Sequence, residues 1–153
     1  MKHTDITLAF PDDANDPRWL ALRRRLWPEA SQDEHRLDAE AVLAKGCCVR
    51  LALSPGGDPV GFAEASVRFD YVNGATSSPV AFLEGLYVEP TWRRKGVARR
   101  LVDEVERWAA GQGCRELASD TLLENTAGQA AHRALGFSET DRVVYFLRPV
   151  RPR

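Results

Sequence analysis

Cysteine, methionine and long apolar runs are scarce in this sequence, and each scarcity excludes a class of protein. The 153 residues include only three cysteines and one methionine. Cys47 and Cys48 are adjacent, a placement that rarely forms a disulfide, and no His/Cys set has zinc-ligand spacing. We therefore expect Cys47, Cys48 and Cys114 to be free thiols, packed as small hydrophobic side chains in a reduced compartment, and we expect no metal ion.

A strong charge of one sign is missing as well. The formal net charge is −1, so no overall field attracts the chain to nucleic acid or to a membrane. No segment approaches the ~20 apolar residues needed to span a bilayer, and residues 1–10 lack the apolar core of a signal peptide. These absences predict a cytoplasmic protein that binds neither nucleic acid nor membrane.

Positive charge is nevertheless concentrated in three short runs. Arginine and lysine fill residues 23–25, 93–95 and 99–100. Such a run is most often the solvated face of a helix, and these lack the interleaved aromatic residues of single-stranded nucleic-acid binders. Only residues 93–95 have neighbours that point to a ligand.

Apolar periodicity and turn residues divide the chain into helices and strands. Asp16 before Pro17 predicts a helix start, and helical spacing continues until Pro28. Further helices are expected over 33–45, 96–112 and 125–135. Strands are expected over 4–10, 47–53, 60–68, 80–88, 114–120, 137–140 and 142–148. This alternation predicts a mixed α/β (α+β) sheet in a single domain, 1–153.

The most informative stretch, residues 86–98, reads Leu-Tyr-Val-Glu-Pro-Thr-Trp-Arg-Arg-Lys-Gly-Val-Ala. A strand leads into a short basic loop, and Gly96 and Ala98 open a long helix. Amides at a helix N-terminus have no intrahelical acceptors, and the helix dipole favours an anion there. The small residues leave the backbone accessible, and the basic side chains add charge-assisted contacts. The pattern indicates a pyrophosphate site, although a glycine near a helix start is by itself more often a plain turn.

The same residues resemble the GNAT acetyltransferases, whose acetyl-CoA motif is Gln/Arg-x-x-Gly-x-Gly/Ala. Residues 93–98 match this motif, and Asn125 and Gly136-Phe137 match two further family positions. The resemblance covers about 4–148. It implies a GNAT-like fold: a central, mostly antiparallel sheet with two splayed parallel strands, 80–88 and 114–120, and flanking helices. It also implies acetyl-CoA as co-substrate between these strands, with an amide near Val88 polarising the acetyl carbonyl.

The family pattern assigns acetyl-CoA binding to one strand end, the basic loop, the start of the next helix and one asparagine. These residues are Leu86, Tyr87, Val88, Arg93, Arg94, Lys95, Gly96, Val97, Ala98, Arg99 and Asn125. Many members carry a tyrosine seven residues beyond the asparagine as general acid for the departing thiolate. This sequence has His132 there, so His132, water or no acid at all stay open as the source of that proton.

Five other stretches are similar to one branch of the family, the aminoglycoside 6'-N-acetyltransferases. They are residues 22–28, 69–74, 77–86, 113–121 and 124–126. The branch implies a polycationic acceptor in a cleft lined by carboxylates and aromatic side chains. It also implies a homodimer, to which the strands expected after residue 136 could contribute.

Glu84 and Asp120 are the candidate catalytic carboxylates, and both are also candidates for binding the acceptor. Glu84 lies inside the most apolar strand, where a carboxylate is costly without a partner or a function. It would orient the amine or take its proton, because an ammonium cannot attack a thioester. A structural ion pair with an arginine is the alternative. Asp120 ends the second parallel strand and would bind a substrate amine, or else cap the following turn.

Trp27, Tyr71, His35 and Asp141 complete the acceptor candidates. Trp27 and Tyr71 match family positions that contact the sugar rings, although such residues more often serve packing. His35 and Asp141 are by default surface residues.

The resemblance implies acetyl transfer to the 6'-amino group of aminoglycoside antibiotics, conferring resistance. Two alternatives stay open: another cationic amine as acceptor (a polyamine, an amino sugar or a protein N-terminus), and a non-catalytic acyl-CoA-binding module.

Overall fold

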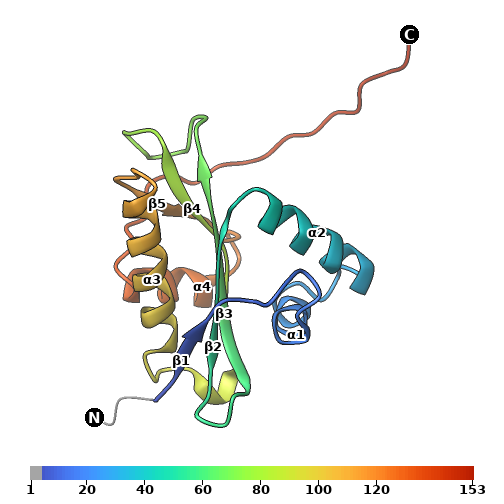
Figure 1. Cartoon of the computed structure of the whole chain (residues 1–153). Helices are drawn as coiled ribbons and strands as arrows, with labels where there is room; N and C mark the ends of the chain where they lie inside the picture. Colours follow the sequence, from blue (N-terminus) through green and yellow to red (C-terminus); the bar gives the residue numbers. More distant parts are fainter. Residues whose placement is uncertain (1–4) are drawn as a thin grey trace. The chain divides into compact units, whose positions relative to one another are not determined.

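The computed structural model describes residues 5–153, and the chain divides into two compact units, Met1–Asp120 and Thr121–Arg153. The described part of the first unit contains a five-stranded sheet and three α-helices (Figure 1). The second unit contains one α-helix followed by a long segment without regular structure.

The sheet of the first unit is mixed and has the strand order β1-β2-β3-β4-β5. Its first four strands pair antiparallel, and the fifth runs parallel to the fourth. The strands are β1 (Thr7–Ala9), β2 (Cys48–Leu53), β3 (Pro59–Arg68), β4 (Val80–Val88) and β5 (Leu117–Ser119). The predicted mixed sheet with one parallel pair is confirmed, and β4 has the predicted bounds. The expected first strand began at Thr4, which lies outside the described residues.

Local capping explains where the first two helices begin. Asp16 precedes α1 (Pro17–Leu26), and its carboxylate accepts a hydrogen bond from the Arg18 amide at 3.0 Å. α2 (Gln32–Ala44) starts at a capping box, in which Ser31 and Glu34 each bond the other's backbone amide. Both helices were predicted within about one residue of these bounds.

The three α-helices of the first unit cover both faces of its sheet (Figure 1). A Cβ placed on Gly61 of β3 would contact Val97 and Leu101 of α3 (Val97–Gly111). A Cβ placed on Gly85 of β4 would instead contact the side chains at the end of α1. α3 therefore packs on one face, and α1 lies on the other with α2.

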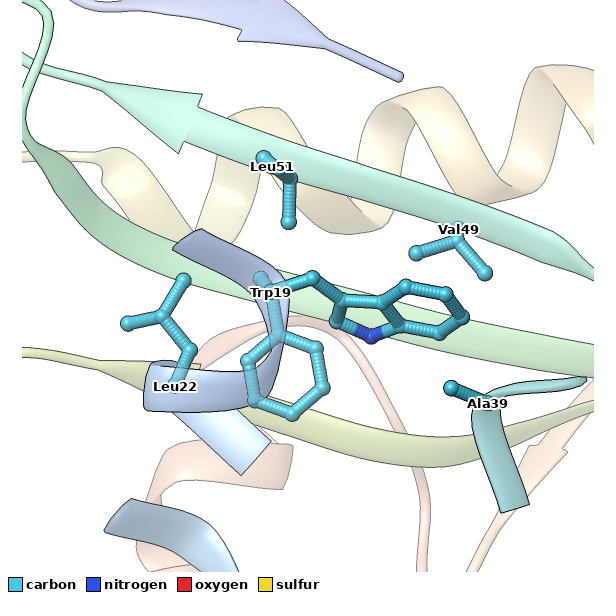
Figure 2. Packing of buried hydrophobic residues seen from close by; sticks show 6 residues of the cluster. Trp19, Leu22, Ala39, Val49 and Leu51 are labelled. Carbon is cyan, nitrogen blue, oxygen red and sulfur yellow. The ribbon is translucent and has the colours of Figure 1, made fainter. Parts of the chain in front are cut away.

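The core between the sheet and α1 and α2 is built around one tryptophan. Trp19 is fully buried among aliphatic side chains of α1, α2 and β2 (Figure 2). Phe62 of β3 belongs to the same cluster. The cluster is Trp19, Leu22, Ala39, Val49, Leu51 and Phe62. Burial of each large apolar side chain contributes about 1.5–3 kcal/mol, which fixes α1 rigidly on the sheet.

The second unit begins with a well-capped helix. The side chain of Asn125 accepts a hydrogen bond from the Gly128 amide at 2.9 Å at the start of α4 (Thr126–Ala134). The helix predicted over 125–135 is thereby confirmed.

The two strands predicted over 137–140 and 142–148 are wrong, because this unit forms no strand after α4. A strand requires a neighbouring strand for its backbone hydrogen bonds, and Thr121–Arg153 supplies none. The apolar side chains that suggested a strand are open to solvent, with Phe146 92% and Leu147 99% exposed.

Candidate functional site

Glu84 lies at a β-bulge of β4. In the register of β3 and β4, Gly85 pairs with Glu64 and Leu83 pairs with Ala65, which leaves Glu84 without a partner residue of its own. The bulge places its carboxylate at the surface, with 38% of the side chain exposed. An accessible carboxylate therefore projects from the middle of an apolar strand.

Two side chains of β3 hold this carboxylate. The Ser66 hydroxyl donates to Oε1 at 2.6 Å, and Arg68 Nη2 donates to Oε1 at 2.9 Å and to Oε2 at 3.1 Å. The Arg68 guanidinium also lies 3.5 Å from the centre of the Phe82 ring. Glu84 thus has the arginine partner that the sequence left open, but the pair is half-exposed rather than buried.

The buried carboxylate of the sheet is Glu64. It is 3% exposed and pairs with Arg23, whose Nη1 donates to both carboxylate oxygens. Burial raises the pKa of Glu64 to about 7, against the opposing effect of the Arg23 charge. The prediction that residues 23–25 form a solvated helix face is wrong for Arg23. This side chain is buried, and the buried Glu64 carboxylate compensates its charge.

Trp27 packs against β4 immediately beside Glu84. A Cβ on Gly85 would approach Cη2 of the Trp27 ring to 2.6 Å, so the ring occupies the space that any larger residue would need. Phe62 meets the same ring edge-on, with centroids 6.0 Å apart, and the Arg23 guanidinium lies 4.7 Å from it. Phe62, Glu64 and Ser66 are alternate residues of β3 and so lie on one face of the sheet. Phe62 contacts Trp27 and Ser66 bonds Glu84, so the two acceptor candidates lie on the same face.

His35 of α2 contacts the backbone of Trp27. Its ring is 1% exposed, and its Nε2 is 2.9 Å from the Trp27 carbonyl oxygen. The sequence suggested a surface residue, but α2 packs this histidine into the interior. A surface hollow of about 320 Å³ opens next to it, lined by Arg23, Trp27, Ala30, His35 and Asp38.

Tyr71 and Asp120 lie in loops of the first unit. Tyr71 is 81% exposed in the connection between β3 and β4, and Asp120 is exposed directly after β5. Glu116 ties the first of these loops to the strand before Asp120: its carboxylate accepts bonds from the Thr76 amide at 2.9 Å and from the Ser77 hydroxyl. These hydrogen bonds lower the pKa of Glu116.

One edge of β4 is open beyond the bulge. β5 pairs with β4 only over Ala81–Leu83, and residues 84–88 have no strand beside them on that side within residues 5–120. The Glu89 amide donates to the Val60 carbonyl of β3 at 2.8 Å. Because amides alternate in direction along a strand, those of Leu86 and Val88 point to the open side. This is the divergence of two parallel strands that the family resemblance implied.

The basic loop places several backbone amides around the start of α3. After the short 3₁₀ helix η1 (Pro90–Trp92), Arg94 has φ 62° and Gly96 has φ 82°, and no side chain or backbone atom lies within 4 Å of the position of a Gly96 Cβ. The first bond along α3 runs from the Arg100 amide to the Gly96 carbonyl, so the amides of Val97 and Ala98 have no acceptor within the helix. A loop with left-handed residues, free helix amides and basic side chains fits a phosphate group.

The loop is anchored to β4 by one of its own arginines. Arg93 Nε donates to the Val88 carbonyl at 2.9 Å. This bond connects the candidate phosphate loop to the strand whose Val88 amide faces the open edge.

The other candidates belong to the second unit. Asn125 caps α4, and its Nδ2 donates to Thr121 Oγ1 at 3.1 Å. His132 Nδ1 is 2.7 Å from the Gly128 carbonyl, and the ring lies edge-on to Phe137. Asp141 is exposed in the segment after α4.

Sequence reasoning missed four residues: Glu64, Ser66, Arg68 and Gly85. The signal for Glu64 was present, since a carboxylate between alanines in the apolar run of β3 is as costly as one in β4. The bulge that decides which carboxylate is buried follows from register, and no local pattern announces it.

A metal-binding cluster and a membrane-spanning helix are both absent from the described part of the chain. No group of three or more His, Cys, Asp or Glu side chains among residues 5–153 could hold a metal ion. No helix in that range is long and apolar enough to cross a membrane.

The three cysteines are free thiols, as predicted, and burial raises the pKa of Cys48 to about 11.

Known proteins are similar to this chain in both sequence and fold. The profile of the acetyltransferase (GNAT) family matches residues 16–137. An aminoglycoside N(6')-acetyltransferase type 1 of Stenotrophomonas maltophilia is 50% identical over 147 residues, which cover 96% of this chain and 94% of the relative. A protein of the same name from Salmonella typhimurium is 48% identical over 128 residues, 84% of this chain and 88% of its own.

Solved structures agree with the sequence relatives. The aminoglycoside 6'-N-acetyltransferase AAC(6')-Ih from Acinetobacter baumannii superposes with a TM-score of 0.89 at 41% identity, covering 95% of this chain and 99% of its own. AAC(6')-Iy in complex with the bisubstrate analogue CoA-S-monomethyl-acetylneamine has a TM-score of 0.87 at 44% identity, covering 97% and 100%. The open edge of β4, the amide-rich loop before α3 and the family match agree, and the chain belongs to the acetyltransferase (GNAT) family.

Proposed function

We propose that this chain transfers an acetyl group from acetyl-CoA to the 6'-amino group of aminoglycosides, and so confers resistance to them. One structural observation carries the proposal. β4 has outward-facing amides at Leu86 and Val88, next to the phosphate loop, and an accessible carboxylate four residues before Val88, beside Trp27. The relatives named above support the choice of acceptor.

Acetyl-CoA supplies the acetyl group, and residues at the junction of β4 and α3 would hold it. The amides of Gly96, Val97 and Ala98 and the side chains of the basic loop would bind its phosphates. Leu86, Tyr87 and Val88 would present the open strand edge, with the Val88 amide directed at the acetyl oxygen. The loop residues Arg93, Arg94 and Lys95 and the α3 residue Arg99 complete this set, and Asn125 is proposed from the second unit.

Carboxylates and aromatic side chains would hold the acceptor. Glu84 would bind the reacting amine and orient it or take its proton, while Trp27 would provide a flat wall beside it. Tyr71 and Asp120 lie in exposed loops where a large polycation can reach them, and Asp141 is proposed as a further anionic contact. His35 is 1% exposed and contacts the Trp27 carbonyl, so its contribution to acceptor binding would pass through Trp27.

The reaction would proceed without a covalent enzyme intermediate. The amine nitrogen would form a bond to the acetyl carbon, the thioester C–S bond would break, and CoA would leave as thiol or thiolate. One proton would leave the acceptor ammonium before the attack, towards Glu84 or water, and a second would leave the nitrogen for water after the C–N bond has formed. The departing thiolate would take a proton from the His132 side chain or from water, or would leave without an acid. Nδ1 of His132 is 2.7 Å from the Gly128 carbonyl oxygen, which occupies that nitrogen.

The organisation of the protein is part of the proposal. We propose that residues 1–153 act as a single domain in the cytoplasm, where acetyl-CoA is available, and that two copies form a homodimer. The apolar side chains of Val144, Tyr145, Phe146 and Leu147 support a dimer, because this row of exposed residues could pair as a strand with a second copy.

Release of free CoA thiol from acetyl-CoA tests the proposed activity. The panel of acceptors would contain kanamycin, tobramycin, an aminoglycoside with a 6'-hydroxyl group, and spermidine. Thiol release with kanamycin and tobramycin alone is the expected result. Release with spermidine but with no aminoglycoside would discard the proposed acceptor, and binding of acetyl-CoA without any release would favour a non-catalytic module.

A further inference from the structure

We infer that His35 and the buried Arg23–Glu64 pair are positioning residues that fix Trp27 and thereby set the acceptor wall beside Glu84. The inference rests on the proposed function, because it assigns a role in acceptor binding. It concerns residues that would touch neither substrate, and it makes Trp27 the point through which they act.

Trp27 occupies a position that helix geometry does not fix. It follows the last residue of α1 and has non-helical backbone angles, φ −124° and ψ 72°, with Pro28 directly after it. Its amide still bonds the Arg23 carbonyl at 2.8 Å, and its own carbonyl, beyond the helix, accepts a long bond from the Ala30 amide at 3.4 Å. A residue of this kind needs tertiary contacts to hold one conformation.

His35 supplies the contact to the backbone. A carbonyl oxygen only accepts hydrogen bonds, so the 2.9 Å contact requires Nε2 to carry the hydrogen and to donate it to Trp27. His35 lies in the first turn of α2, whose start is fixed by the Ser31–Glu34 capping box. The bond therefore fastens the end of α1 to the start of α2.

Arg23 supplies the contact to the ring. Its guanidinium lies 4.7 Å from the Trp27 ring centre and 5.9 Å from that of Trp19, within the range of cation–π attraction. Glu64 holds the guanidinium through both carboxylate oxygens, and Asp38 lies 3.6 Å from its Nη2. The planar fork of arginine is suited to this task because it binds a carboxylate and stacks on a ring at once.

Gly85 completes the enclosure of the indole. With Gly85 against one part of the ring, Phe62 at its edge and Arg23 near its centre, the ring has little room to rotate. Glu84 directly precedes Gly85, and the bulge puts its carboxylate on the same face of the sheet as the indole. A shift of the indole therefore changes the space in which the amine would meet that carboxylate. The candidate phosphate loop follows the C-terminal end of β4 and makes none of these contacts.

The test compares three variants with the parent chain. His35→Phe removes the donor and keeps an aromatic ring, and His35→Gln restores an amide donor of similar reach. Ser31→Ala weakens the start of α2 by about 1 kcal/mol without touching Trp27, and so controls for a general loss of helix stability. For each variant we would measure the KM of kanamycin, the KM of acetyl-CoA and kcat.

His35→Phe is expected to raise the KM of the amine about fivefold, the equivalent of one lost hydrogen bond, with the KM of acetyl-CoA unchanged. His35→Gln is expected to recover most of this change, and Ser31→Ala is expected to leave both constants near those of the parent. An equal rise in both KM values, no rise in either, or the same effect from Ser31→Ala would overturn the inference.

Acrylamide quenching of tryptophan fluorescence separates this inference from the proposed activity, since it needs no turnover. His35→Phe is expected to increase the quenching, and the increase is expected to vanish when Trp27 is also replaced by phenylalanine. A parent chain without turnover but with this quenching pattern would refute the proposed reaction and leave the fixing of Trp27 intact. Unchanged quenching in His35→Phe would refute the positioning role whatever the activity.

Discussion

Gly85 lies against the Trp27 ring so closely that a Cβ on the glycine would come within 2.6 Å of Cη2 and 2.9 Å of Cζ2. The closest contact is with a large ring that Phe62 and Arg23 also enclose, so it has no flexible end that could move aside. The glycine is thus required by the packing of the acceptor wall rather than by its backbone conformation.

Replacing Gly85 by alanine should displace the indole. Overpacking of this kind costs about 1–3 kcal/mol, so we expect the urea midpoint of the variant to be lower than that of the parent. We also expect the KM of the amine to rise by a larger factor than the KM of acetyl-CoA. Gly111→Ala is the matched control, because nothing lies within 4 Å of its added Cβ at the end of α3. Urea denaturation and steady-state kinetics measure both effects, and equal behaviour of the two variants would refute the packing argument.

The Arg68–Glu84 pair predicts competition between two cations for one carboxylate. Arg68 covers both oxygens of Glu84 in this structure, and a cationic acceptor would have to share or displace it. Since both side chains are half-exposed, the pair contributes no more than about 1 kcal/mol and can be exchanged.

Arg68→Gln is therefore expected to lower the KM of the aminoglycoside about fivefold at low salt, with less effect at high salt. Arg107→Gln removes the same charge from an exposed pair on α3 and should change neither KM. A higher KM in Arg68→Gln would mean that Arg68 holds Glu84 in place instead of competing for it.

Two glycines at the ends of α3 separate backbone strain from phosphate binding. Gly96 has φ 82° and Gly113 has φ 81°, and neither has an atom within 4 Å of an added Cβ. Alanine at either position should cost about 1 kcal/mol in the free energy of unfolding, because both require a left-handed residue.

Only Gly96→Ala is expected to raise the KM of acetyl-CoA, by about tenfold, since its amide belongs to the proposed phosphate site. The KM of the amine should stay close to that of the parent in both variants. If Gly113→Ala raised the KM of acetyl-CoA equally, the effect would be one of helix stability and not of binding.

Asp16 predicts a loss of stability in acid. Its hydrogen bonds from the Arg18 side chain, with further bonds from the Asp12 and Arg18 amides, lower its pKa from 3.8 to about 2. A carboxyl group with a lowered pKa in the folded state contributes stability that is present above pH 3.8 and disappears as the pH falls towards 2.

The contribution amounts to about 2 kcal/mol at neutral pH. Asp16→Asn keeps a good capping residue but loses the charge, so the difference in unfolding free energy from the parent should shrink as the pH is lowered. Urea denaturation at several pH values measures this difference, and a gap that stays constant with pH would contradict the assignment.

The sequence was sufficient for most of the elements and for the family. The strand 80–88 and the helix starts at Asp16 and Gly96 carry local signals, namely an apolar run, an N-cap before proline and a glycine before a long amphipathic stretch. The strands expected after 136 failed because a local pattern does not reveal whether a pairing partner exists in the same chain.

The candidate site could be predicted only in part. Glu84 and Trp27 were named from the sequence, but their meeting depends on Gly85 and on the bulge, which are properties of the register between β3 and β4. The same register decides that Glu64 is buried with Arg23 while Glu84 is accessible. Long-range pairings of this kind leave no signature in a stretch of neighbouring residues.

The position of the transferred acetyl group distinguishes the proposed reaction from its alternatives. The chain would be incubated with acetyl-CoA and kanamycin, and the product examined by two-dimensional NMR. A single acetyl group on the 6' nitrogen is expected, since one amine at a time would meet Glu84 beside the open edge of β4. Acetylation of a different amine, or hydrolysis of acetyl-CoA with unchanged kanamycin, would contradict it.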